Sequence, residues 1–356
     1  MNIFEATASY EDWMRRSIGV VESHLRHKHA IMKKDLFAFL KGSFYRWNQL
    51  WVERMPPSLR NAPKILAVGD LHVDSFGTWR DLEGRLVWGI DDFDEAWPLP
   101  YTSDLVRLAT SVKVAIDSGL LSLRLRDACE TLIGSYRKSL RHGGAPITLA
   151  EHEQHMERLG IEAIKPVAHF WSTLDHLPIA RPPAPRDALR ALERFLPAGL
   201  PYKVVRRIAG TGSLGHPRFV ALGEWKGAYL AREAKAVLPS ACAWFAHRSS
   251  SRSWSEQVRK AALRSHDPFH TTWNGWLVRR LSPDSNPIEI FSWPKKRDEM
   301  VLLGSMGREV ANVHLGSKRR VPAILRHLAK QDGSWLRAAA KTMAKALEAE
   351  WNEFRK

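Results

Sequence analysis

The chain has few cysteines and no long apolar run. Only Cys129 and Cys242 occur among its 356 residues, so the sequence offers neither a disulfide framework nor the ligand spacing of a cysteine zinc site. No segment approaches the roughly 20 apolar residues of a membrane-spanning helix, so we expect no membrane span. The scarcity of cysteine and the absence of a signal-peptide pattern in the first residues favour a cytoplasmic protein.

Acidic residues are also scarce relative to basic ones. Lys and Arg number 54 against 38 Asp and Glu, which gives a formal net charge of +16. This excess favours anionic partners: nucleotides, phosphorylated metabolites, nucleic acid or an acidic membrane surface. A basic tail could bind nucleic acid, but a solvated helix face is the commoner role of such a run. Its basic residues are Lys318, Arg319, Arg320, Arg326, Lys330, Arg337, Lys341 and Lys345.

The acidic residues that are present gather in one short stretch. Two apolar, strand-like runs at 65–68 and 86–90 each end in carboxylates, and a turn sequence lies between them. We therefore expect the two runs to pair as a hairpin and to bring Asp70 near Asp91 and Asp92. The alternative is a solvated hairpin edge, since Asp and Gly are common in turns. The crowded carboxylates are Asp70, Asp74, Asp91, Asp92 and Asp94.

Clustered carboxylates repel one another and persist where a divalent cation or a proton transfer needs them. Phosphoryl transfer has that need, because one aspartate takes the proton of the attacking hydroxyl and another holds magnesium. A strand that ends in Asp70-Leu-His72 is also typical of dinuclear metallophosphatases. That chemistry requires further Gly-Asp and Gly-Asn-His segments, which the sequence lacks, so it is the weaker alternative.

A glycine-rich segment farther along supplies a candidate phosphate-binding loop. Gly210, Gly212 and Gly215 form a G-x-G-x-x-G pattern that includes Ser213. The dinucleotide fold follows this pattern with a helix, whereas the kinase glycine loop is followed by a strand. Here a strand-like run at 217–222 follows, which favours the kinase type. A tight hairpin turn, which also requires glycine, is the alternative.

Lys235 lies at the end of the next apolar strand, at the distance from the glycine loop that the kinase pattern has. Such a lysine pairs with the nucleotide phosphates, and a glutamate on the following helix orients it. Glu256 is the candidate for this glutamate. Ser253-Trp-Ser-Glu256 is equally a capping box at the start of a helix, and the sequence does not decide between the two roles.

Taken together, these motifs resemble the bacterial domain-of-unknown-function 2252 family. The resemblance is carried by Phe37-Ala-Phe-Leu-Lys-Gly-Ser-Phe44, Gly69-Asp-Leu-His-Val-Asp-Ser-Phe-Gly77, Asp91-Asp-Phe-Asp-Glu-Ala96, Asp104-Leu-Val-Arg-Leu-Ala109, and Gly210 to Gly215 with Lys235. It implies a protein-kinase-like fold, and the catalytic segment is similar to that of aminoglycoside phosphotransferases. It does not imply a particular substrate.

The resemblance also implies roles for individual residues. Asp70 matches the aspartate that orients and deprotonates the acceptor hydroxyl. Asp92 matches the magnesium-binding aspartate, with Asp91 as the competing register. Asp104 matches an aspartate that anchors the catalytic loop, although plain helix capping would explain it as well.

One position departs from the kinase pattern. Kinases place a magnesium-binding asparagine five residues after the catalytic aspartate, and this chain has Ser75 there. A serine hydroxyl is a shorter and weaker ligand, for which Asp74 could compensate. Without compensation, the chain would be a nucleotide-binding regulatory protein with little turnover.

The resemblance implies an α+β, kinase-like fold of two lobes, and the order of the motifs predicts that it is circularly permuted. In kinases the glycine loop and its lysine precede the catalytic aspartate, and here they follow it. We expect the carboxylates of Asp70 and Asp92 to face Lys235 across one cleft. The expected segments are a helical lobe with the acidic hairpin (1–177), a proline-rich linker (178–186), a β-rich nucleotide-binding lobe (187–295) and C-terminal helices that pack back on the helical lobe (296–356). A polar helix at 150–175 and a strand at 288–293 are expected within them.

The sequence therefore predicts an ATP- and magnesium-dependent phosphotransferase that acts on an unknown small-molecule or protein acceptor. The alternatives are the weakly catalytic nucleotide-binding protein and a basic nucleic-acid-associated protein.

Overall fold

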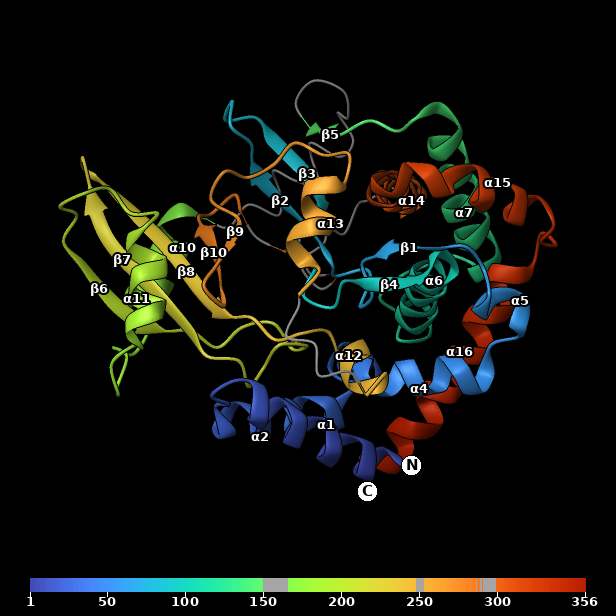
Figure 1. Cartoon of the computed structure of the whole chain (residues 1–356), viewed down its shortest axis with the longest axis horizontal. Coiled ribbons are helices and arrows are strands. Elements are labelled where there is room, and N and C mark those ends of the chain that lie inside the picture. Colours follow the sequence, from blue (N-terminus) through green and yellow to red (C-terminus); the bar gives the residue numbers. More distant parts are fainter. Residues whose placement is uncertain (150–165, 248–252, 286, 289, 291–298) are drawn as a thin grey trace.

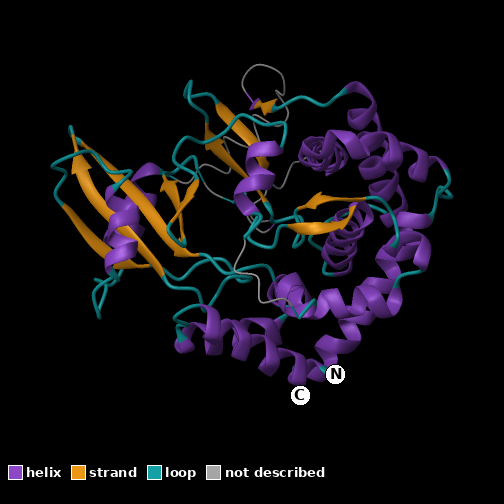
Figure 2. Cartoon of the chain, in the orientation of Figure 1, coloured by secondary structure: helices purple, strands orange, loops and turns teal. Residues whose placement is uncertain are grey.

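The computed structural model describes all residues except 150–165, 248–252, 286, 289 and 291–298. The described chain is of the α+β class, with a lobe of helices and a lobe built on an antiparallel sheet (Figures 1 and 2). No helix among the described residues is long and apolar enough to cross a membrane. Cys129 and Cys242 are both buried and unpaired.

The helical lobe contains segments from both halves of the chain. Its core helices α6 and α16 pack against each other, as do α7 and α14, so helices that follow the sheet in sequence close the lobe that begins the chain. In α16, Leu336, Ala340, Met343 and Leu347 recur at helical spacing and are buried. The helices are α1 (Ile3–Ser17), α2 (Glu22–Lys34), α3 (Leu36–Gly42), α4 (Phe44–Arg54), α5 (Pro57–Arg60), α6 (Tyr101–Asp117), α7 (Leu125–His142), α14 (Glu299–His314), η2 (Leu315–Arg320), α15 (Val321–Ala329) and α16 (Trp335–Phe354).

The sheet lobe is a five-stranded antiparallel sheet in the order β6-β7-β8-β10-β9. Helix α11 (Arg186–Glu193) packs on one face, and α10 (Val167–Asp175) buries Phe170 and Leu174 in a second apolar cluster with other residues of this sheet (Figure 1). The strands are β6 (Tyr202–Arg206), β7 (Arg218–Trp225), β8 (Ala228–Ala236), β9 (Thr271–Trp273) and β10 (Trp276–Leu281).

Two small sheets pack against the helical lobe. Strand β1 (Lys64–Ala67) pairs with β4 (Trp97–Pro100), and β2 (Phe76–Arg80) pairs with β3 (Leu86–Ile90), which also pairs with the short β5 (Ile147–Thr148). The expected pairing of 65–68 with 86–90 is therefore wrong. Strand β2 forms the hairpin with β3 because it is nearer along the chain, and Asp81 stabilises their turn by accepting hydrogen bonds from the amides of Glu83 (3.0 Å) and Arg85 (2.9 Å).

The segment boundaries also differ from the expected ones. The proline-rich stretch is not a free linker, because Ile179 forms a bridge with Val205 and the Ala180 amide donates to the Val204 carbonyl, so it extends the sheet. Helix α10, expected in the helical lobe, packs with the sheet. Conversely, α12 (Ala241–Phe245) and α13 (Ser255–Ala261) lie between strands β8 and β9 in the chain but contribute to the core of the helical lobe. Most of the expected helix at 150–175 and strand at 288–293 lies outside the described residues.

Candidate functional site

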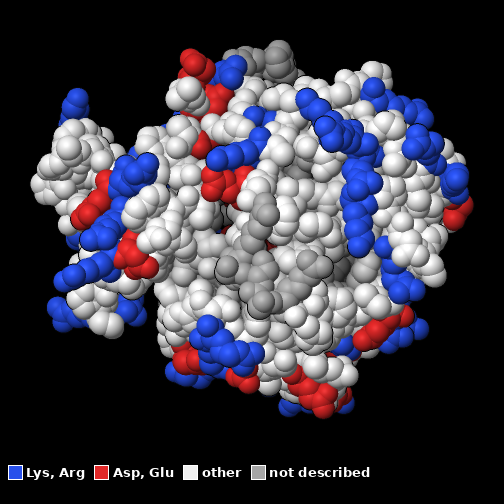
Figure 3. Space-filling model, in the orientation of Figure 1, with Lys and Arg blue, Asp and Glu red and all other residues white. Residues whose placement is uncertain are grey.

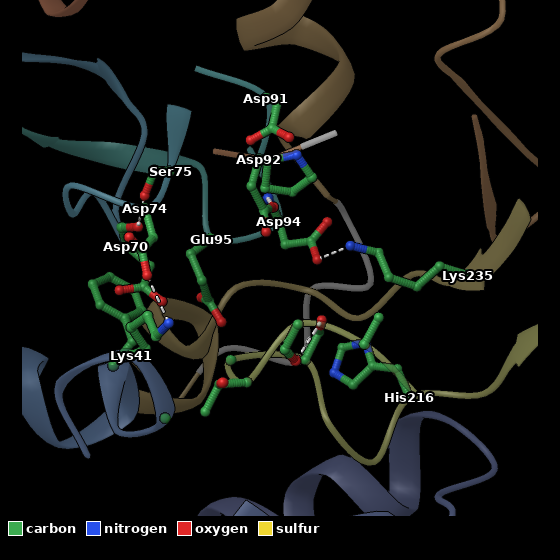
Figure 4. A pocket seen from close by; sticks show the side chains of 18 of the residues that line it. Lys41, Asp70, Asp74, Ser75, Asp91, Asp92, Asp94, Glu95, His216 and Lys235 are labelled. Carbon is green, nitrogen blue, oxygen red and sulfur yellow. Dashed lines mark hydrogen bonds and ion pairs between the residues drawn. The ribbon is translucent and has the colours of Figure 1, made fainter. Parts of the chain in front are cut away.

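A cavity of about 410 Å³ lies between the two lobes. The helical lobe contributes a largely acidic wall and the sheet lobe contributes a basic one (Figure 4). In the view of Figure 3, one group of acidic side chains lies at the boundary between the lobes. The charged lining residues are Lys28, Lys41, Asp70, Asp74, Asp91, Asp92, Asp94, Glu95, Arg207, Arg218, Lys235 and Arg279, together with His72, His216 and His270. The cavity thus brings together Asp70, Asp92 and Lys235, as expected for one cleft.

The loop that carries Asp70 is held by Asp104. The carboxylate of Asp104 accepts hydrogen bonds from the amides of Val68 (2.8 Å) and Gly69 (2.9 Å), and it lies 3.0 Å from Nε2 of His314. Asp104 and His314 are completely buried. Helix α6 has no side-chain cap, so capping does not explain this residue. Asp104 instead ties the start of the loop to α6 and, through His314, to the end of α14.

Asp70 is oriented by one arginine. Arg107 donates from both Nε and Nη2 to Oδ1 of Asp70, while its guanidinium lies over the ring of Trp47 and donates to the Leu40 carbonyl. Burial raises the pKa of Asp70 and Arg107 opposes that rise, with Asp92 adding to it. A Cβ atom on Gly212 would lie 3.5 Å from Oδ2, so this second oxygen faces the glycine loop. One carboxylate oxygen is fixed and the other faces the cavity.

Ser75 and Asp74 have structural partners of their own. The Ser75 hydroxyl accepts from the His72 amide (2.9 Å) and donates to the Asp70 carbonyl (3.2 Å), which closes the loop on itself. The carboxylate of Asp74 pairs with Lys41 (2.8 Å) and accepts from the Ile290 amide (2.7 Å). Both residues line the cavity, and the Asp74 carboxylate already has two partners there; its compensation for the missing asparagine stays a prediction.

Three aspartates follow strand β3 and line the cavity, and Asp94 points toward Lys235 (Figure 4). Asp94 forms an ion pair with Lys235. The carboxylate of Asp92 accepts a hydrogen bond from the Asp94 amide (3.0 Å). Burial raises the pKa of Asp91 to about 7, with Arg279 opposing and Asp92 contributing to the rise. Asp92 is exposed and Asp91 only partly so, and neither forms an ion pair with another described residue. Both therefore stay open as cation ligands.

The glycine loop between β6 and β7 is fixed from below by the N-terminal helices. Lys28 donates to the Gly212 carbonyl (3.0 Å), and the Val21 amide donates to the Gly215 carbonyl (2.9 Å). The hydroxyl of Ser213 accepts from Arg218 (2.5 Å). A Cβ atom on Gly212 would lie only 3.2 Å from the Lys41 carbonyl. A glycine at this position therefore lets the loop approach the Asp70 segment closely.

Glu256 does not reach Lys235. It forms an ion pair with Lys260 one turn farther along α13 and does not line the cavity. The capping box is also not formed, because α13 begins after Trp254 without a side-chain cap. The position expected for Glu256 is taken by Asp94, because α13 packs on the helical lobe rather than over the sheet.

Several site residues were missed by sequence reasoning. Arg107 lies three residues after Asp104 on a helix whose apolar spacing predicts burial, and a charged residue at a buried position could have indicated it. Glu95 directly follows the acidic cluster and accepts from the Ser240 hydroxyl (2.8 Å) and the Ala241 amide (2.7 Å), while burial raises its pKa to about 8. His314 and Glu233 carry no local pattern, because their partners are distant in the sequence.

The donor set fits magnesium bound together with phosphates rather than a preformed metal centre. No group of three or more His, Cys, Asp or Glu side chains among the described residues could hold an ion alone. Magnesium commonly binds one or two carboxylates and completes its shell with water and substrate phosphates. Asp91 and Asp92 could supply those carboxylates on the side of the cavity that faces Lys235.

The part of the chain that matches a known family contains the acidic wall of this cavity. Residues 19–168, less than half of the chain, match the model of a family described as an uncharacterized protein conserved in bacteria, DUF2252. The matched segment includes Asp70, Asp92 and Asp104 and ends before the glycine loop. Searches of curated proteins and of solved structures found no match. Over residues 19–168 the chain is therefore similar to the bacterial family that its motifs indicated.

Proposed function

We propose that the chain is an ATP- and magnesium-dependent phosphotransferase with a permuted kinase-like arrangement. The observation that carries this proposal is the shared cavity: Asp70 and Asp92 come from one lobe, and the glycine loop and Lys235 come from the other. These are the parts that phosphoryl transfer requires, because its catalysis rests on positioning and charge neutralisation.

The order of the strands supports the proposal that the sheet lobe binds the nucleotide. The glycine loop connects the first two strands, and Lys235 lies on the third, paired on one side with Arg218 of β7 and on the other with Leu277 of β10. Kinases likewise have the glycine loop between the first two strands of the lobe and the lysine on the third strand. The permutation lies in the order along the chain, where Asp70 precedes this lobe.

The residues of the chain divide the work as follows. Asp70 accepts the proton of the acceptor hydroxyl through the oxygen that Arg107 leaves open. Lys235 and the amides of the glycine loop hold the donor phosphates, and Asp92 and Asp91 hold magnesium, which supplies charge neutralisation when bound. Binding of phosphates by Lys235 would require its ion pair with Asp94 to open.

Ser75 favours a second candidate, a nucleotide-binding protein with little turnover. Its hydroxyl is used within the Asp70 loop, so the second cation ligand of kinases has no ready substitute. Binding and turnover therefore need separate measurements.

Binding is tested by thermal shift with ATP and magnesium. Wild type should gain melting temperature in a metal-dependent way, and Asp92→Ala and Lys235→Ala should lose that gain. Asp117→Ala and Lys260→Ala, which change exposed charges away from the cavity, should keep it. No shift for wild type at millimolar nucleotide would rule out the proposal.

Turnover is tested by release of the γ-phosphate of ATP with water as the acceptor. Wild type should release phosphate, and Asp70→Asn should bind ATP but release at least about 100-fold less, the usual contribution of a positioned base. Tight binding without release in wild type would favour the regulatory alternative.

A further inference from the structure

Three arginines on the sheet lobe surround a single buried glutamate. Glu233 accepts hydrogen bonds from Arg207 (2.7 Å), Arg218 (2.9 Å) and Arg279 (2.8 Å), and its side chain is completely buried. Although burial would raise the pKa of Glu233, the three guanidinium groups hold it well below its usual range. Glu233 is therefore a carboxylate, and it balances one of the three positive charges of this arginine cluster (Arg207, Arg218 and Arg279).

Several N–H donors of the arginine cluster have no hydrogen-bond acceptor among the described residues. A guanidinium has five N–H donors, and among the described residues Arg207 and Arg279 use one side-chain nitrogen each, both toward Glu233. The buried Nε of Arg218 has no partner in the same part of the chain. All three arginines line the cavity. Arg218 is buried and Arg207 and Arg279 are partly buried, so an anion that enters the cavity finds cationic donors with few competing partners.

The cluster lies directly beside the lysine that is proposed to hold the donor. Arg218 is opposite Lys235 in the β7–β8 register, and Arg279 is opposite Glu233 in the β8–β10 register. Glu233 precedes Lys235 by two residues, where the kinase pattern has an alanine. The floor beneath the glycine loop thus presents guanidinium groups instead of a small apolar side chain.

We propose that Arg207, Arg218 and Arg279 form a second phosphate-binding subsite, which takes a phosphate or pyrophosphate group in addition to those under the glycine loop. Guanidinium groups suit this ligand because their paired N–H donors match phosphate oxygens. The group belongs either to the donor nucleotide or to a phosphorylated acceptor. Only this assignment to the reaction rests on the proposed function; the binding of phosphate does not.

The test uses inorganic tripolyphosphate without metal, measured by titration calorimetry on the full chain. Arg207→Gln and Arg279→Gln should each weaken binding about tenfold or more, the range expected for a lost charged hydrogen bond. The matched control is Arg206→Gln, because Arg206 is the neighbour in sequence but donates to the Pro182 carbonyl outside the cavity. Equal affinity in wild type and both cavity variants, or no binding to wild type, would overturn the subsite.

Glu233→Gln separates a binding role from a purely structural one. Removing the carboxylate leaves three uncompensated arginines, so tripolyphosphate should bind more tightly even though the melting temperature falls. Unchanged or weaker binding in this variant, at a temperature where it is folded, would show that the arginines only stabilise the sheet and would overturn the proposal.

Further measurements distinguish a donor phosphate from an acceptor phosphate, and the subsite from the proposed phosphotransferase. If the group belongs to the donor, Arg279→Gln should weaken ATP as much as tripolyphosphate. If it belongs to an acceptor, ATP affinity should stay unchanged and ATP should bind together with pyrophosphate. Asp92→Ala should keep metal-free tripolyphosphate binding. If tripolyphosphate binds while ATP with magnesium does not, the phosphotransferase fails and the subsite stands.

Discussion

At the scale of single residues, Asp104 is the strongest structural link of the site. It satisfies two buried amides at the start of the Asp70 loop and contacts His314. We expect Asp104→Ala to lower the free energy of unfolding by about 3 kcal/mol or more, because it leaves those amides buried without an acceptor. Urea unfolding measures the loss.

Asp117→Ala is the matched control on the same helix. Its carboxylate is half exposed and pairs only with Lys113 one turn earlier among the described residues. We expect a change within about 0.5 kcal/mol. Equal losses in the two variants would contradict the anchoring role of Asp104.

Two partly buried acids predict how stability depends on pH. Burial raises the pKa of Asp91 to about 7 and that of Glu95 to about 8, so the folded chain binds more protons than the unfolded chain between about pH 4 and pH 8. Stability from these groups is therefore full at low pH and declines as the pH rises through that window. Glu95→Gln keeps an oxygen for Ser240 and Ala241 but does not titrate. The melting temperature of wild type should fall more steeply than that of the variant from about pH 5 to pH 8, and parallel curves would contradict this.

Residue types that act through local pattern were predictable, and those that act through tertiary contact were not. Asp70, Asp92 and Lys235 each end a strand-like run, which is visible in the sequence, and they line one cavity. Glu256 was expected from spacing alone, but the orientation of its helix depends on packing. Glu233 could not be recognised because its three arginines come from segments that are far apart in the sequence.

At the scale of elements, the glycine loop depends on its contact with the N-terminal helices. Gly215 has φ +104°, and a Cβ atom there would lie 2.6 Å from Cδ2 of Leu25 in α2. Gly227, in the β7–β8 turn, also has positive φ (+82°) but open space around it. We expect Gly215→Ala to cost about 1 kcal/mol more unfolding free energy than Gly227→Ala, because only the first adds a clash to the backbone strain. Urea unfolding of both variants checks this. Equal losses of unfolding free energy would show that the Leu25 side chain moves aside at no cost.

Strand existence was predicted better than strand partners. The runs at 65–68 and 86–90 are both strands, but each pairs with a different neighbour. Periodicity and turn residues indicate where a strand lies, whereas pairing depends on which strand is nearest in space. The carboxylates nevertheless converge, because both small sheets end at the same cavity.

At the scale of the whole molecule, α16 closes the helical lobe with one face and shows its charges on the other. Met343 is completely buried and Lys345 is exposed. We expect Met343→Asp to lower the free energy of unfolding by more than about 3 kcal/mol, since it buries an unpaired charge, and Lys345→Asp to change it by less than about 0.5 kcal/mol. Urea unfolding distinguishes them, and a large effect of Lys345→Asp would mean that the basic face is structural.

The basic excess is not confined to α16. Figure 3 shows a band of Lys and Arg across the helical lobe, apart from the acidic group at the lobe boundary. The solvated-face and nucleic-acid interpretations of the tail both stay predictions. Binding to duplex DNA would separate them, because phosphate-backbone contacts weaken steeply with added salt.

The contact between Asp104 and His314 has a consequence for synthesis. The ribosome releases the Asp70 loop early, but α14, which carries His314, follows only after the whole sheet lobe. Until then the loop lacks one of its supports, and the acidic wall has no basic wall opposite it. The cavity is therefore complete only after the segments of both lobes have been synthesised.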